Sequence, residues 1–212
     1  MTKHIGIFGG TFDPVHAGHI RCASFVQQYC RLDSVRLMPC HLPPHRASPG
    51  VSAAQRADMV ALAIAHNPLL ALETLELTHD RPSYTVDSLT TLRNRLTDTQ
   101  LYFIIGMDSL CYFSQWKNYR LILQLAHVLV CQRPGYDAAM GDAPALLAEF
   151  GEQQLSVVKQ QASGAIMLLP NPTTDLSATA IRQALRLGQS CDADTLDPAV
   201  LNYIQTRRLY QD

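Results

Sequence analysis

Short apolar runs alternate with amphipathic stretches along most of this chain, the pattern of buried strands separated by helices. Apolar runs at 3–8, 34–38, 70–75, 101–105, 127–131 and 166–169 predict strands. Apolar residues at helical spacing predict helices that begin near Ala17, at Ser52, at Val86, at Ala178 and at Pro198. This order predicts an α/β, Rossmann-like fold, with a doubly wound, mostly parallel sheet and helices on both faces.

Local signals mark where several of these helices begin. Ser52 is a favourable N-cap for a helix that would run to His66, and Asp197 before Pro198 suits a helix start because proline needs no N–H in the first turn. Residues 133–164 are weakly patterned and predict only helix plus loop. We expect one domain over 1–212, with an α/β core over about 1–170 and a small C-terminal helical part over about 171–212.

Composition narrows the partners. The chain has 212 residues, 47% of them hydrophobic, and 17 Lys and Arg against 18 Asp and Glu give a net charge of -1. It therefore lacks the basic surplus with which proteins attract nucleic acid, and no nucleic-acid partner is expected. An anionic ligand has to be held by local groups, which suits a small phosphorylated substrate.

Six scattered cysteines, none in a C-x-x-C pair, indicate reduced thiols and a cytoplasmic location. The longest apolar run, over 121–131, is interrupted by polar residues and is too short to span a bilayer, so no membrane association is expected. The sequence leaves open whether the protein is a homo-oligomer.

The strongest chemical signal is the segment GGTFDPVHAGH at 9–19, between the first strand and the first helix. Gly9 and Gly10 allow a tight turn and close approach of a ligand, and the helix start offers free N–H groups to a phosphate. His16 and His19 are three residues apart, so their imidazoles point the same way and can donate hydrogen bonds to one phosphate. A zinc pair or two ordinary surface histidines are the alternatives, but no third zinc ligand is evident.

A second anion site is predicted at LSATAIR, 176–182. Ser177 is a plausible N-cap, the following N–H groups are free for an anion, and the guanidinium of Arg182 suits phosphate oxygens. An ordinary capped helix with a solvated arginine is the alternative that local sequence leaves open.

These two segments resemble the H-x-G-H and I-S-S-T-x-I-R signatures of the nucleotidyltransferase superfamily, with Ala178 where the family commonly has a second serine. Neither a P-loop motif nor G-x-G-x-x-G is present, which argues against a P-loop enzyme and a dinucleotide-binding dehydrogenase. The resemblance implies an ATP-binding set comprising Gly9, Gly10, Thr11, Phe12, His16, Gly18, His19, Gly106, Asp108, Ser177, Thr179 and Arg182.

The middle of the chain bears on the second substrate. The N–H groups at Thr85, which follows PSY, would be unsatisfied at a helix start and could hold a carboxylate, although a simple helix cap is an equal alternative. Gly106 permits close approach, Asp108 could accept from ribose hydroxyls, and Trp116 could stack on a pyridine ring or simply fill the core.

PSYT, IIGMDSL and Trp116, with the PPHR loop at 43–46 and the tail at 200–210, resemble the nicotinate-nucleotide adenylyltransferase branch of the superfamily. The resemblance implies that nicotinate mononucleotide contacts Phe12, His45, Arg46, Ser83, Tyr84, Thr85, Met107, Trp116 and, as a weaker candidate that would face the adenosine end, Arg133. Many relatives have lysine at position 46.

The implied reaction is a direct, in-line attack of the nicotinate mononucleotide phosphate on the α-phosphorus of ATP, which gives nicotinate adenine dinucleotide and pyrophosphate in NAD biosynthesis. His16, His19, Arg46 and Arg182 would be catalytic, and Mg²⁺ would arrive with ATP without a protein metal site. Nicotinamide mononucleotide or phosphopantetheine as acceptor is the nearest alternative, and an inactive nucleotide-binding regulator is a remote one.

Overall fold

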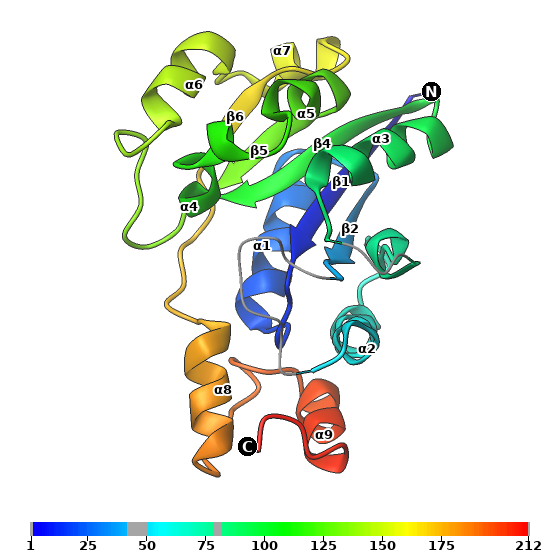
Figure 1. Ribbon diagram of the computed structural model, residues 1–212, viewed down its shortest axis with the longest axis vertical. Coiled ribbons are helices and arrows are strands. Elements are labelled where there is room, and N and C mark those ends of the chain that lie inside the picture. The colour runs from blue at the N-terminus through cyan, green and yellow to red at the C-terminus, as the bar shows by residue number, and fades with distance from the viewer. Residues whose placement is uncertain (1, 42–50, 79–81, 212) are drawn as a thin grey trace.

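The computed structural model describes residues 2–41, 51–78 and 82–211. In this part of the chain, six strands form one sheet in the order β3-β2-β1-β4-β5-β6, and every neighbouring pair is parallel. The strands are β1 (Lys3–Gly10), β2 (Ser34–Pro39), β3 (Leu70–Leu72), β4 (Thr99–Gly106), β5 (His127–Cys131) and β6 (Ile166–Leu169). The predicted α/β Rossmann-like fold is confirmed, with a sheet that is entirely parallel (Figure 1).

Helices connect successive strands and close the chain. They are α1 (Ala17–Tyr29), α2 (Ala53–Ile64), α3 (Thr85–Arg95), α4 (Met107–Leu110), α5 (Tyr119–Leu125), α6 (Ala143–Phe150), α7 (Leu155–Gln160), α8 (Ala178–Arg186) and α9 (Pro198–Thr206), with 3₁₀ helices η1 (Leu75–Thr78) and η2 (Phe113–Gln115). Ser52 accepts a hydrogen bond from the N–H of Gln55, and Asp197 accepts one from Ala199, so both predicted N-caps are confirmed.

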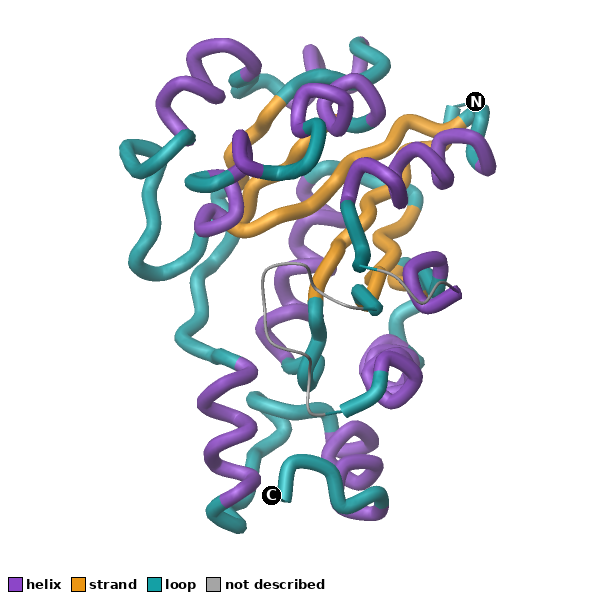
Figure 2. Tube along the Cα trace, in the orientation of Figure 1, coloured by secondary structure: helices purple, strands orange, loops and turns teal. Residues whose placement is uncertain are grey.

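The sheet has a separate hydrophobic core on each face because neighbouring residues of a strand point to opposite sides. Tyr102, Ile104 and Leu129 pack on one face against residues of α1, α2, α7, α8 and α9. Leu101, Phe103 and Val128 pack on the other face against α3, α4, α5 and α6. The strands in the middle of the molecule, with helices around them, are traced in Figure 2.

Two predicted segments differ in detail. The strand expected over 70–75 ends at Leu72, and the chain turns into η1, where buried Glu73 accepts a hydrogen bond from the N–H of Leu75 and pairs with Arg36 at 3.0 Å. The weakly patterned region at 133–164 contains two helices, α6 and α7, which cover different faces of the sheet.

The C-terminal helices lie together at one end of the molecule, beyond the end of the sheet (Figure 1). Helix α9 packs against α2, and the N–H of Ala17 donates to the carbonyl of Thr195 at 3.0 Å. The end of the chain is thereby joined to the start of α1. The assignment of 1–212 to a single domain stays a prediction. Among the described residues, no helix combines the length and apolar character needed to cross a bilayer.

Candidate active site

The predicted loops meet at the carboxyl ends of β1 and β4, the two central strands. The connection from β1 leads to β2 on one side, whereas β4 lies on the other side, so the sheet order reverses here. Ligands of open α/β sheets bind at this kind of switch point. The segment 9–19 follows β1, and Gly106 and Asp108 stand at the end of β4, which places two of the predicted ATP-binding segments side by side.

His16 and His19 stand at the start of α1 with their ring centroids 3.8 Å apart. The backbone N–H of His16 donates to Nδ1 of His19 at 3.2 Å. Because that nitrogen accepts, the proton of a neutral His19 is on Nε2, where it can be donated to a ligand. His16 is buried, and its Nδ1 has no hydrogen-bond partner among the described residues.

Both imidazoles are neutral at pH 7. Burial, with smaller contributions from the charges of Arg133 and Arg21, lowers the pKa of His16 to about 4. Burial, followed by the neighbouring His16 and by Arg133, lowers the pKa of His19 well below its usual value. The pair can therefore offer N–H donors to a ligand but no positive charge. In the described part of the chain, no three His, Cys, Asp or Glu side chains are grouped so that they could hold a metal ion.

Phe12 was expected to touch both substrates, but its side chain is only 2% exposed. The ring packs edge-on against Phe8 and His19, and a Cβ on Gly10 would lie 2.9 Å from it. Gly10 is therefore needed so that the aromatic ring can fill the turn from beneath. A ligand at this turn can reach the backbone of Phe12, not the buried ring.

The second anion segment reaches the first. Arg182 of α8 donates from Nη1 to the carbonyl oxygen of Asp13 at 2.7 Å and lies 3.7 Å from its carboxylate. A Cβ on Gly18 would lie 3.0 Å from Thr174 as well as from His16, so the loop before α8 lies close against the imidazole pair at this glycine. The two ends of the chain thus converge, as the sequence interpretation requires.

Ser177 and Thr179 occupy the start of α8. Ser177 accepts from the N–H of Ala180 at 3.2 Å, which confirms the predicted N-cap. The hydroxyl of Thr179 accepts from Arg182 at 3.4 Å. These contacts hold Arg182, whose side chain is 27% exposed, at the edge of the site.

Asp13 is a residue that the sequence analysis missed. It is 8% exposed, and its carboxylate accepts a hydrogen bond of 2.7 Å from the hydroxyl of Tyr210 in addition to its contacts with Arg182. Burial and the contact with Asp13 raise the pKa of Tyr210, against the smaller opposing effect of the Arg182 and Arg56 charges. Asp13 lies inside the GGTFDPVHAGH segment, so its position was a signal, but its partners are about 170 and 197 residues away.

Arg56 of α2 was also missed. It is 1% exposed and donates to backbone carbonyls in the loops after β1 and β2. Its sequence context gives no signal, because an arginine in an amphipathic helix ordinarily projects into solvent.

At the end of β4, Gly106 and Asp108 are close together, since a Cβ on Gly106 would lie 2.4 Å from Oδ1 of Asp108. The other carboxylate oxygen accepts from Arg133 at 2.6 Å, while Oδ1 is buried without a described partner. Buried polar atoms are nearly always satisfied, so the unpaired atoms on Asp108 and His16 are available to a ligand. Arg133, predicted for the acceptor, is placed with Asp108 and near the imidazoles.

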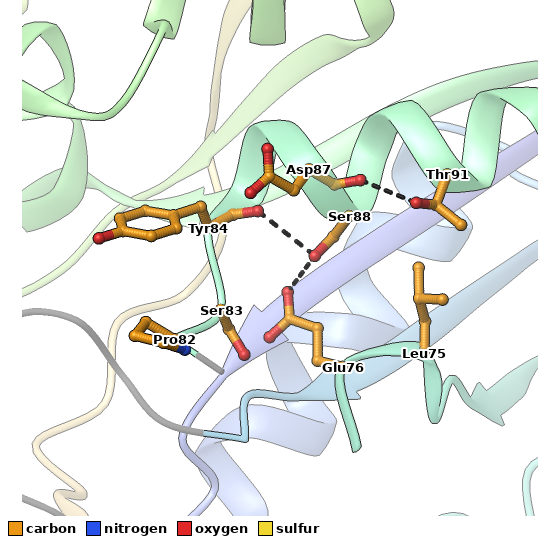
Figure 3. A pocket seen from close by; sticks show the side chains of 8 residues that line it. All are labelled: Leu75, Glu76, Pro82, Ser83, Tyr84, Asp87, Ser88 and Thr91. Atoms are coloured by element: carbon orange, nitrogen blue, oxygen red, sulfur yellow. Dashed lines mark hydrogen bonds between the residues drawn. The ribbon is translucent and has the colours of Figure 1, made fainter. Parts of the chain in front are cut away.

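The predicted carboxylate position is at the start of α3, whose first residue is Thr85 and whose N-cap is Tyr84. A small pocket there is lined by Leu75, Glu76, Pro82, Ser83, Tyr84, Asp87, Ser88 and Thr91 (Figure 3). The hydroxyl of Ser88 donates to buried Glu76 at 2.6 Å, and burial raises the pKa of Glu76. Two carboxyl groups line this pocket and Thr85 does not, so the pocket itself does not suit an anion. The group that suits an anion is the set of N–H groups at the start of α3, beside the pocket.

Lys117, which follows Trp116, contacts the start of α3. Lys117 lies 4.6 Å from the ring centroid of Tyr84 and forms an ion pair of 3.1 Å with Asp87. Trp116 is half-buried against Phe113, with ring centroids 5.3 Å apart. One part of its indole thus packs in the protein while the rest remains available.

One of the expected acceptor contacts is a core residue, and two others lie outside the described part of the chain. Met107 is 5% exposed and belongs to the core on the α3 face, so its side chain is a packing residue. His45 and Arg46, together with the PPHR loop, lie outside the described residues.

A pair of neutral imidazoles at the start of α1, an arginine from the distant helix α8 and an acid beside a glycine turn lie at the carboxyl edge of this Rossmann-like sheet, an arrangement that suits a nucleotidyltransferase. The model of the cytidylyltransferase-like family matches residues 7–184. A "Probable nicotinate-nucleotide adenylyltransferase" of Chromobacterium violaceum is 45% identical, with all of both chains covered, and one of Cellvibrio japonicus is 43% identical over the same share. The chain therefore belongs to the nicotinate-nucleotide adenylyltransferase family.

Solved structures agree on the fold. Nicotinic acid mononucleotide adenylyltransferase of Plasmodium falciparum, complexed with NaAD, superposes with a TM-score of 0.73 at 18% identity, covering 98% of this chain and 97% of its own.

Proposed function

We propose that this protein transfers the adenylyl group of ATP to nicotinate mononucleotide, with release of pyrophosphate. Full-length relatives at 45% and 43% identity carry this activity in their names. The observation that carries the proposal is the meeting of the His16–His19 pair with the Asp13–Arg182 contact at the carboxyl end of β1. The reaction needs no covalent nucleophile from the protein, because the phosphate of the acceptor is itself an anionic nucleophile.

We assign the imidazoles to the α-phosphate. As neutral donors at a helix start, they stabilise the charge that builds on the phosphate oxygens during in-line attack, and the N–H groups of α1 add to this effect. Arg182, which Asp13 holds in place, is assigned to the departing pyrophosphate together with Arg46. Asp108 is assigned to a ribose hydroxyl, because its Oδ1 is a buried acceptor without a described donor.

We propose that Mg²⁺ reaches the site bound to ATP. The described residues include no cluster of three or more His, Cys, Asp or Glu side chains able to hold a metal ion. Phosphate oxygens and water then supply its ligands, as is usual for this cation, and it neutralises charge on the triphosphate. The chain's own residues position the phosphates and donate hydrogen bonds.

The acceptor is tested by direct comparison. Pyrophosphate release is measured with ATP and, in separate reactions, nicotinate mononucleotide, nicotinamide mononucleotide or phosphopantetheine. We expect the acid mononucleotide to be strongly preferred, because the N–H groups at the start of α3 bind a carboxylate better than an amide. Equal rates with acid and amide would refute this role for Thr85, and product only from phosphopantetheine would refute the assignment of the acceptor.

The imidazole role is tested with His19→Ala and a matched control, His66→Ala, which changes an exposed histidine just after α2. We expect His19→Ala to lower kcat about 100- to 1,000-fold, the usual effect of removing one donor to a developing negative charge. The control should stay within about two-fold of the wild type. Near wild-type turnover of His19→Ala would remove the assignment. An inactive regulator would instead bind ATP and release no pyrophosphate with any acceptor.

A cytoplasmic location follows as a proposal from the six cysteines, all of which are free thiols in this structure. Nucleic acid is not proposed as a partner, and the oligomeric state stays open.

A further inference from the structure

Arg56 is a cation enclosed in the protein. Its residue is 1% exposed, and it is one of the largest fully buried side chains in the described part of the chain. None of the described carboxylates forms an ion pair with it. Burial of an unpaired charge is unfavourable unless hydrogen bonds compensate for lost hydration. The contacts that compensate here therefore deserve a functional explanation.

Three backbone carbonyls supply this compensation. Nη1 donates to Thr11 at 2.6 Å, and Nη2 donates to Cys40 at 2.6 Å and to His41 at 3.0 Å. Thr11 follows β1, whereas Cys40 and His41 follow β2. The forked guanidinium thus joins the two loops that leave neighbouring strands at the carboxyl edge of the sheet, where the imidazole pair lies.

The bond to Thr11 also orients a peptide group. The Thr11–Phe12 bond is trans, so the N–H of Phe12 points away from the carbonyl that Arg56 holds. Phe12 itself has φ of 50°, a left-handed conformation that is rare for residues other than glycine. Such a conformation persists only where the surroundings fix it. The hydrogen bond from Arg56 to Thr11 and the packing of the buried Phe12 ring fix this backbone conformation.

We propose that Arg56 is a positioning residue of the transfer site, which holds Thr11 after β1 against Cys40 and His41 after β2 and directs the Phe12 N–H toward the phosphates. This inference rests on the proposed function. Arg56 does not touch substrate in this role; it acts through Thr11, Cys40 and His41, and its buried charge adds positive potential beneath the phosphate groove.

The chain offers a matched control in Arg93 of α3. Arg93 likewise donates to two backbone carbonyls, those of Thr99 at 2.5 Å and of Leu125. Thr99 begins β4, so this arginine joins segments at the amino end of the sheet, opposite the site. Arg56→Met and Arg93→Met therefore remove the same kind of bonds from the two ends of one sheet, and Arg56→Lys retains the charge without the fork.

The experiment measures kcat, the KM for each substrate and the melting temperature of all three variants, with assays well below the lowest melting temperature. We expect both methionine variants to melt earlier, but only Arg56→Met to lose about 100-fold in kcat, the cost of a displacement of about 1 Å at reacting groups. The kcat of Arg56→Lys should lie between those of Arg56→Met and the wild type. If Arg56→Met does not fold, the kcat of Arg56→Lys tests the proposal. Arg93→Met should keep kcat within about three-fold.

Equal kcat for the folded Arg56 and Arg93 variants would overturn the proposal and leave Arg56 a purely structural residue. A loss confined to KM would also overturn it, because it would mean that Arg56 binds substrate uniformly rather than arranging the reacting groups. Wild-type turnover measured in the same series separates these outcomes from a failure of the proposed function, in which the wild type itself would release no pyrophosphate.

Discussion

The hydrogen bond between Tyr210 and Asp13 allows a quantitative test of how burial determines the strength of a contact. Tyr210→Phe removes one hydroxyl that donates to a carboxylate at 2.7 Å, with both residues 8% exposed. Hydrogen bonds to charged groups contribute about 1.5–3 kcal/mol, so we expect a loss of about 2 kcal/mol in the free energy of unfolding. For a chain of this size, that corresponds to a fall of about 4–8 °C in melting temperature.

Tyr203 provides the control, because its hydroxyl donates to Asp58 at the same distance, 2.7 Å, but at the surface. Tyr203→Phe should cost less than about 0.5 kcal/mol, as surface substitutions usually do. The two variants are compared by urea unfolding and by calorimetry at one pH and salt concentration. Equal losses would refute the reasoning, since they would show that enclosure of the Asp13 carboxylate adds nothing to its bond with Tyr210.

Three further expectations concern the site. Gly106→Ala places a Cβ 2.4 Å from Oδ1 of Asp108, so the carboxylate must move. The KM for ATP should rise about ten-fold or more while the melting temperature changes little. An unchanged KM would argue against Asp108 as a ribose ligand. Since the pKa of His16 is lowered to about 4, the unfolded chain binds a proton between pH 6.5 and 4 that the folded chain excludes. Stability from this residue is fully present above pH 6.5 and is lost as the pH falls toward 4, by up to about 3 kcal/mol, so urea unfolding of His16→Asn should depend less steeply on pH than that of the wild type. Trp116→Ala should raise the KM for nicotinate mononucleotide about ten-fold and leave the KM for ATP unchanged. Trp116→Phe keeps a stacking face and should raise the first KM less. If the KM for nicotinate mononucleotide is the same in the two variants, Trp116 has a packing role alone.

The fold could be predicted because its determinants are local. The strands β4 and β5 are buried on both faces and consist largely of apolar residues, and Ser52, Ser177 and Asp197 mark helix starts by their own chemistry. The prediction extended strand β3 too far, because the strand ends where Glu73 forms ion pairs with arginines elsewhere in the chain.

The site was predicted only where a motif is contiguous. The segment at 9–19 and the helix start at Ser177 could be read from neighbouring residues. The Asp13–Tyr210 contact could not be predicted, because it joins segments far apart in sequence. The contacts of Arg56 could not be predicted either, because its partners are backbone carbonyls of distant segments, and backbone atoms have the same chemistry at every position. The burial of the Phe12 ring was missed for a related reason: the motif specifies the residue but not which of its atoms faces the ligand.

The contacts of Asp13 have a consequence for the order in which the molecule matures. During synthesis, Asp13 leaves the ribosome early, and every strand of the described sheet precedes residue 170. Arg182 and Tyr210, the side chains that contact Asp13, are synthesised after all of these strands. All strands of the sheet can thus be synthesised while the loop after β1 still lacks these two contacts, which it gains only when residues 182–210 have docked.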